Sequence, residues 1–377
     1  MTSSTLEPEN NSETQLRPQN SGNGRGRKST PKSSSAKAKA QAMFFISCIL
    51  VVLILIPFTT ETYKLVQDYL KDKPNGYEWP SIGDFWITLA ATPFFLMLEN
   101  AFQYFLYPWY YQHCKEKVDL EARDQRTRKA VTNIYKCIYY TAATIVGWYT
   151  LKDSYILPPA LGGKGSLDNL FTDFPYITPP PLYRFYFTGT MGYHIGSLLH
   201  HTFAHKKAND YLEMMFHHLV TFYLYAFSYM TNTLIGAVIA YIHDIADVGV
   251  TWTRAWSESN HKKFTAYSFL LTLVFWFYTR LTMLPWCIYV ATFKLEVYTV
   301  SPYVQPIFGF LLICLFILHI YWFVLCLKIM LNFFVKGVAE DLQNQSGRAS
   351  KYEDAQYVPK NSSRKNSNKE GKSQKLE

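Results

Sequence analysis

An apolar stretch from Met214 to Trp252 limits what this chain can fold into more than any other part of the sequence. It holds about 39 residues and, as one straight helix at about 1.5 Å per residue, would be about 58 Å long. The hydrocarbon core of a bilayer is only about 30 Å thick. The stretch therefore predicts a hairpin of two membrane-spanning helices, with its turn near Met230-Thr231-Asn232.

This hairpin brings the polar residues of the stretch to one depth in the membrane. His217 and His218 precede the turn by about as many residues as His243 and Asp244 follow it, and Asp247 shares a helix face with His243. A single His in an apolar helix is usually a hydrogen-bonded packing residue. Ionisable groups are costly to bury in a membrane, however, and several at one depth indicate a functional site.

The same residues form part of a longer pattern that resembles the signature of ceramide synthases in the TLC-domain superfamily. The pattern reads HH-x-x-T-x-x-L-x-x-x-SY-x-x-N, followed by a Gly and then by HD-x-x-D. Its residues here are His217-His218, Thr221, Leu224, Ser228-Tyr229, Asn232, Gly236, His243-Asp244 and Asp247. The resemblance extends to Thr279-Arg280-Leu281 and Pro285 in a later apolar stretch.

Composition separates an apolar middle from two polar tails. Residues 1–41 and 337–377 are poor in large apolar side chains, so we expect both to be disordered. The middle predicts an all-α, polytopic membrane helix bundle of about eight transmembrane helices, with an N-terminal anchor at 42–62. The resemblance implies a TLC-type catalytic domain at 84–336. The expected spans are 43–60, 84–107, 132–151, 183–203, the two arms of 214–252, 266–291 and 303–334.

The net charge of +9 is carried mainly by basic residues in the tails and short loops. No aromatic and basic face joins them, so we predict no nucleic-acid binding. Their distribution instead predicts that both termini and the basic loop 108–130 are cytosolic, and that the Pro- and Gly-rich loop 152–182 is lumenal. The 108–130 loop is too short for the homeobox-like domain that many animal ceramide synthases carry. The six Cys have no spacing typical of a disulfide framework or a zinc site.

The resemblance implies an N-acyltransferase of the endoplasmic reticulum membrane, with several membrane passes. Such an enzyme transfers a fatty acyl group from acyl-CoA, its co-substrate, to the amine of a long-chain sphingoid base. It needs no cofactor and no metal, it works among membrane lipids, and a homo- or heterodimer is left open. In relatives the loop corresponding to 292–302 influences the length of the acyl chain.

The resemblance also suggests roles for individual residues. His217 would attack the thioester or act as a base, with His218 in support, because an imidazole titrates near neutral pH and forms acyl intermediates. Asp244 and Asp247 would orient imidazoles, and His243 would be either a second base or structural. The residues expected to bind substrate are Ser228, Tyr229, Asn232 and Arg280.

Two other interpretations remain open at this point. His200-His201 and His205 form an H-x-x-x-H that, with His217-His218, is similar to the histidine boxes of membrane di-iron desaturases and hydroxylases. Those enzymes need more His boxes than this chain has. The other interpretation is a non-enzymatic TLC-domain protein in lipid sensing or translocation, but such proteins generally lack the HH and HD-x-x-D residues.

Overall fold

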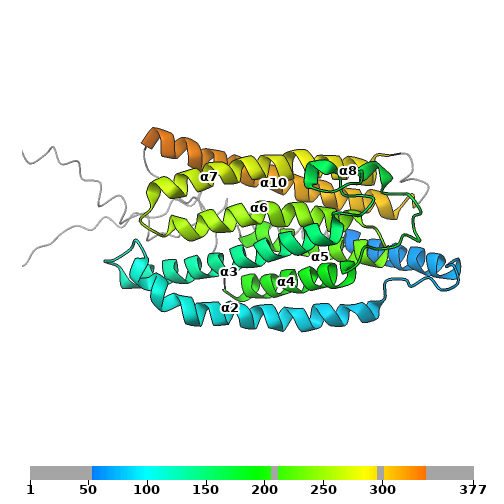
Figure 1. The fold of residues 1–377 in the computed structure, drawn as a ribbon, viewed down its shortest axis with the longest axis horizontal. Helices are drawn as coiled ribbons and strands as arrows, with labels where there is room; N and C mark the ends of the chain where they lie inside the picture. Colours follow the sequence, from blue (N-terminus) through cyan, green and yellow to red (C-terminus); the bar gives the residue numbers. More distant parts are fainter. Residues whose placement is uncertain (1–52, 205–210, 295–300, 337–377) are drawn as a thin grey trace, which may run out of the picture. The chain divides into compact units, whose positions relative to one another are not determined.

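The computed structural model describes residues 53–204, 211–294 and 301–336, all of which belong to one compact unit (Figure 1). These residues form helices joined by turns and contain no β-strand, so the all-α prediction is confirmed for them. The predicted tails lie outside the described residues. The long helices are 53–71, α2 (Trp86–His113), α3 (Leu120–Leu151), α4 (Tyr183–Ala204), α5 (Tyr211–Met230), α6 (Ile235–Ser257), α7 (Lys262–Trp276), α8 (Leu284–Thr292) and α10 (Val304–Lys336).

Four helical stretches in the described part of the chain are long and apolar enough to cross a membrane. They are Ile82–His113, Ile235–Ser257, Lys262–Thr292 and Val304–Asn332. The chain is therefore a multi-pass membrane protein, and the number of eight spans stays a prediction.

The predicted turn between two helices is confirmed, while a membrane span by each of the two helices stays a prediction. α5 ends at Met230, α6 begins at Ile235, and the backbone N–H of Thr233 donates to the carbonyl of Ser228 at 2.9 Å to close the turn. Asn232 takes a left-handed conformation with φ of 55°, which Asn adopts more readily than most residues. The turn therefore falls where the sequence places it.

The predicted loop 108–130 is wrong. α2 continues to His113 and α3 already begins at Leu120, so the connection is confined to 114–119. The carboxylate of Asp119 accepts a hydrogen bond from the N–H of Ala122 at 3.0 Å and caps α3. The sequence prediction ended each helix at the bilayer thickness, whereas good helix formers after Asp119 extend α3 beyond it. The helix at 53–71 likewise runs past the predicted anchor boundary at 62.

The segment 152–182 is a packed cap rather than an open loop. It contains two short 3₁₀ helices, η2 (Pro159–Leu161) and η3 (Leu167–Asn169). Its buried apolar side chains join the same hydrophobic core as α5 and α6, and they are Ile156, Leu157, Leu161, Leu167, Leu170 and Ile177. In Figure 1 the cap lies at the end of the bundle opposite the α2–α3 and α6–α7 connections.

Helix α6 lies at the centre of the bundle. It packs against α3, α5, α7 and α8, while α10 packs against α5 and α8. α6 also contacts η4 (Phe277–Met283), a π-helical turn that joins α7 to α8. Polar residues of α5, α6, η4 and α10 therefore meet inside the bundle.

Candidate functional site

The π-helical turn directs Arg280 into the bundle. Pro285 follows the turn and has no N–H, so it cannot donate to the carbonyl four residues earlier as an α-helix requires. The wider turn accommodates this interruption, and π-turns are common at functional sites. As a result Arg280 is only 3% exposed although it carries a full charge.

Arg280 is the centre of a hydrogen-bond network. Its Nη2 donates to Oδ1 of Asp247 at 2.8 Å and to the backbone carbonyl of His243 at 3.0 Å. Its Nη1 lies 3.2 Å from Nδ1 and 3.1 Å from Nε2 of His319, and its guanidinium covers the ring of Trp276 at 5.0 Å. The ion pair with Asp247 offsets part of the cost of burying the charge. Arg280 is thus paired with an acid of the motif, and its expected role in substrate binding stays a prediction.

The tautomers of His243 and His319 follow from their partners. Nδ1 of His243 lies 2.6 Å from the carbonyl of Ile239, which only accepts, so this nitrogen carries a proton. Nε2 of an uncharged His243 then accepts, and Nε2–H of His319 donates to it at 2.9 Å. Nδ1 of His319 is left as an acceptor, which Arg280 satisfies. Both ring nitrogens of His243 are therefore occupied.

His217 and His218 differ from His243 in this respect. Nδ1 of each is buried and has no hydrogen-bond partner among the described residues. Their rings lie 5.6 Å apart, and His218 is 8% exposed. Leaving a buried polar group without a partner costs about 1–3 kcal/mol. These two imidazoles thus keep a ring nitrogen available for a ligand.

Helix α10 lines the site beside His217. The ring of His319 lies 6.0 Å from the ring of His217, and the ring of Trp322 lies 5.4 Å from it at an angle of 76°. His319 is fully buried and its ring is 4.9 Å from that of His243. His319 therefore links the two histidine groups that the hairpin brings to one depth.

Asp244 faces aromatic hydroxyls rather than an imidazole. It is 1% exposed, and its carboxylate accepts one long hydrogen bond, from Tyr186 at 3.5 Å. The hydroxyls of Tyr139 and Tyr225 are buried without partners within the described ranges, and both residues lie close enough to interact with the charge of Asp244. The structure places a tyrosine hydroxyl beside Asp244 and Arg280 beside Asp247, and the role of these acids in orienting imidazoles stays a prediction.

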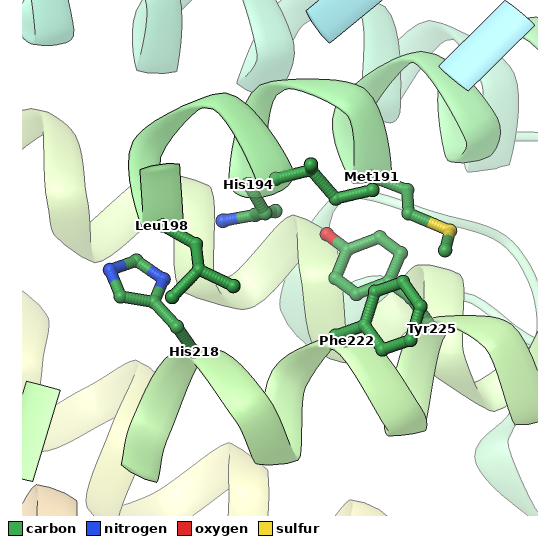
Figure 2. A pocket seen from close by; sticks show the side chains of 7 residues that line it. Met191, His194, Leu198, His218, Phe222 and Tyr225 are labelled. Atoms are coloured by element: carbon green, nitrogen blue, oxygen red, sulfur yellow. The ribbon is translucent and has the colours of Figure 1, made fainter. Parts of the chain in front are cut away.

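A small cavity of about 10 Å³, the space of a single water, adjoins His218 (Figure 2). His194 of α4, His218 and the hydroxyl end of Tyr225 face it, and the ring centroids of His194 and Tyr225 are 5.3 Å apart. A larger apolar groove of about 380 Å³ lies between α3, α6 and α7. Its α6 residues, which include Val248 and Trp252, occupy the face turned away from His243. The groove therefore does not open onto the histidines.

Three residues expected to bind substrate lie elsewhere. Ser228, Tyr229 and Asn232 are at the turn of the hairpin, and Ser228 is about 16 Å along α5 from His217. Tyr229 donates to Oδ2 of Asp84 at 2.7 Å, and the side-chain amide of Asn232 donates to the carbonyl of Pro175 at 2.9 Å. The side chains of Tyr229 and Asn232 thus hold the turn against η1 (Ile82–Phe85) and the cap, away from the imidazoles, and substrate binding by the three residues stays a prediction.

The histidine-box interpretation gains no support from the arrangement of its members. His200 contacts Oε2 of Glu99 at 3.0 Å, whereas His201 lies 3.3 Å from the carbonyl of Tyr211 and faces α5. His205 lies outside the described residues. Within the described part of the chain, no three His, Cys, Asp or Glu side chains are grouped so that they could hold a metal ion.

The sequence interpretation missed His319, Trp322 and His194. His319 is the single His in the last apolar stretch, so the same cost of burial that singled out the hairpin histidines applies to it. His194 lies inside the predicted span 183–203, so the same signal applies to it. Trp322 gave no comparable signal, because its position beside the site depends on how distant helices pack.

Comparison with known proteins gives a family. The TLC domain matches residues 129–328, more than half of the chain and all of the site. ASC1-like protein 1 of Oryza sativa subsp. japonica is 26% identical over 299 residues, which cover 73% of this chain and 94% of that protein.

Two further relatives are named ceramide synthases. Ceramide synthase hyl-1 of Caenorhabditis elegans is 26% identical over 235 residues, 59% of this chain and 62% of its own length. Ceramide synthase 4 of Bos taurus is 28% identical over 218 residues, 57% of this chain and 53% of its own length. The chain thus spans nearly all of the rice relative and somewhat more than half of the other two.

Proposed function

Since the chain belongs to the TLC-domain family, we propose that it is a ceramide synthase, which transfers a fatty acyl group from acyl-CoA to the amine of a sphingoid base. The reaction makes an amide from a thioester and releases CoA. The site inside the bundle supports this activity through three groups of residues: the imidazoles of His217 and His218, the network around Arg280, and the carboxylate of Asp244.

The observation that carries the proposal is the difference between the histidines. His217 and His218 keep a buried Nδ1 without a partner in the described structure, whereas His243 has both nitrogens occupied. Only the first two are therefore free to bond to a carbonyl carbon or to take a proton. We assign His243 the structural alternative of the two that the sequence left open.

The chemistry proceeds in two steps. In the first, the unprotonated nitrogen of His217 attacks the thioester carbonyl, the oxyanion collapses and CoA leaves as a thiolate, which takes up the proton of the other ring nitrogen and leaves a neutral acyl-imidazole. In the second, the substrate ammonium gives one proton to a base, the resulting amine attacks the acyl-imidazole, and the proton that the amine loses on forming the amide passes to the departing ring nitrogen, so that neutral imidazole is expelled. His218 lies next to His217 and is the base that we assign.

The surroundings of Asp244 suit the sphingoid base. This substrate carries an ammonium group and hydroxyls on neighbouring carbons, which need an acceptor and hydrogen-bond partners. Asp244 offers a buried carboxylate with one long hydrogen bond, and Tyr139 and Tyr225 offer hydroxyls without partners among the described residues. We assign Asp244 to the ammonium and the tyrosines to the hydroxyls.

The proposed function also implies a cellular location for the protein and an orientation in the membrane. Acyl-CoA is anionic and does not cross membranes, so the site needs access from the cytosol. We propose an endoplasmic reticulum location with both termini cytosolic, which puts the α2–α3 and α6–α7 connections on the side from which CoA approaches.

The test is N-acylation by purified protein in lipid nanodiscs supplied with a long-chain acyl-CoA and a sphingoid base. Wild type forms the N-acyl product and free CoA in equal amounts. His217→Ala forms none above background, while His113→Ala, which removes an exposed histidine at the end of α2, matches wild type. A His217→Ala protein that acylates the base at the wild-type rate would reject the proposed site, and a wild type without product would reject the function.

A further inference from the structure

Trp322 carries an N–H group that the fold leaves without an acceptor. It lies on α10 one turn after His319 and is 7% exposed. Its Nε1 is buried and has no hydrogen-bond partner in the described ranges. The indole ring meets the imidazole of His217 edge to face at 5.4 Å. A buried donor without an acceptor therefore lies against the nucleophile.

Other tryptophans in this fold show what such a group ordinarily does. Nε1 of Trp276 donates to the carbonyl of His319 at 3.3 Å, that of Trp79 to the carbonyl of Met230 at 3.1 Å, and that of Trp148 to the carbonyl of Gly162 at 3.1 Å. Each of these three indoles satisfies its donor with a main-chain oxygen. An unsatisfied buried N–H costs about 1–3 kcal/mol, so an acceptor supplied by a ligand would recover that free energy.

Attack on a thioester supplies an acceptor of the right kind. When a nitrogen of His217 bonds to the carbonyl carbon, the electron pair of the C=O double bond moves to oxygen. The resulting oxyanion lies two bonds from the imidazole nitrogen, beside a ring that the indole contacts edge to face at 5.4 Å between centroids. Donors aimed at such an oxygen stabilise the transition state more than the ground state.

The unpartnered donor of Arg280 fits this role less well. Nε of Arg280 is also buried without a partner in the described part of the chain. Its guanidinium is held over Trp276 and bound to Asp247, and its contacts are with His319 and His243 rather than with His217. Of these two donors, Trp322 is the one whose ring contacts His217.

We propose that Trp322 is a catalytic residue whose Nε1–H donates a hydrogen bond to the acyl oxygen in both tetrahedral intermediates. This inference rests on the proposed function. In the first intermediate the oxyanion re-forms the carbonyl and expels CoA thiolate; in the second it re-forms the carbonyl and expels the imidazole of His217. The indole keeps its proton throughout, so it changes no charge and needs no co-reactant.

The test replaces the N–H while keeping the ring. Trp322→Phe removes the donor and retains an aromatic side chain, and benzothienylalanine at position 322 keeps the indole shape with sulfur in place of N–H. Trp148→Phe is the matched control, because it removes a hydrogen-bonded indole N–H at the capped end of the bundle. The measurements are kcat, KM for acyl-CoA, the single-turnover rate of acylation and the thermal midpoint.

Loss of one oxyanion donor typically lowers kcat about 10²–10³-fold. We expect a fall of this size in both position-322 variants, in the acylation rate as well as in kcat, with KM within about twofold of wild type. Trp148→Phe keeps the wild-type kcat.

A benzothienylalanine variant with wild-type kcat overturns the inference even if Trp322→Phe is impaired, because shape alone then explains the effect. A raised KM for acyl-CoA with unchanged kcat also overturns the inference, since the indole then contributes only to binding of the acyl chain. Both results are obtained by comparing a variant with a wild type that makes the N-acyl product, so neither contradicts the proposed function. A wild type that makes no N-acyl product rejects the proposed function itself.

Discussion

The Nε2 atoms of His243 and His319 lie 2.9 Å apart, joining residues that are 76 positions apart in the chain. The carbonyl of Ile239 fixes the tautomer of His243, and that of His319 follows from it. His243 therefore belongs to the scaffold of the site, and His319 connects it to Arg280.

Replacement of His319 tests this connection. His319→Phe removes both the donor to His243 and the acceptor for Arg280, so we expect kcat to fall at least about tenfold. His319→Gln keeps an N–H donor and a carbonyl acceptor and should recover part of the loss. Steady-state kinetics of the two variants provide the comparison. Equal activity of His319→Phe and wild type would show that the network does not position the site.

Variants of the buried ion pair between Arg280 and Asp247 distinguish its contribution to stability from its contribution to activity. Arg280→Met leaves the carboxylate unpaired, and we expect the free energy of unfolding to fall by about 3–5 kcal/mol. Combining it with Asp247→Leu removes both charges and should recover most of the stability but none of the activity. Thermal unfolding and N-acylation assays on the single and double variants are the measurements. An active double variant would assign the pair to folding alone.

Tyr229→Phe tests the correction at the hairpin turn. Tyr229 donates to Asp84 at 2.7 Å and lies far from the imidazoles, so the variant should lose about 1–2 kcal/mol of stability. Its kcat and its KM for the sphingoid base should stay within about twofold of wild type. A large rise in that KM with unchanged stability would restore Tyr229 as a substrate-binding residue.

The close approach of Gly236 to Ser228 explains why the motif has a Gly at position 236. A Cβ at Gly236 would lie 2.4 Å from Oγ and 2.5 Å from Cβ of Ser228. Gly236→Ala should therefore destabilise the protein by about 1–3 kcal/mol through overpacking. Ser228→Gly in the same protein opens the space and should recover part of that loss. A double-mutant cycle on thermal midpoints measures the coupling, and strictly additive effects would reject the contact.

The sequence alone predicted the parts of the site that depend on local pattern and on the cost of burying charge. The hairpin and the histidines and acids on its arms follow from span length and helical spacing. The links made by His319 and Trp322 depend on how α10 packs against α5, which no local pattern encodes.

The errors also have physical causes. Helices extend beyond the bilayer where helix formers continue, so the loop at 108–130 was misjudged. Membership in a motif does not reveal a role: Tyr229 and Asn232 belong to the same pattern as the histidines, but their side chains bond Asp84 and the cap at the turn.

The central claim is that His217 carries the acyl group, and the most direct measurement is mass spectrometry of the protein after reaction with acyl-CoA in the absence of sphingoid base. The account predicts one acyl group on His217, absent from His217→Ala and consumed on addition of the base at least as fast as the enzyme turns over. An active enzyme that shows no adduct at His217, or an adduct that the base does not consume at that rate, would contradict it.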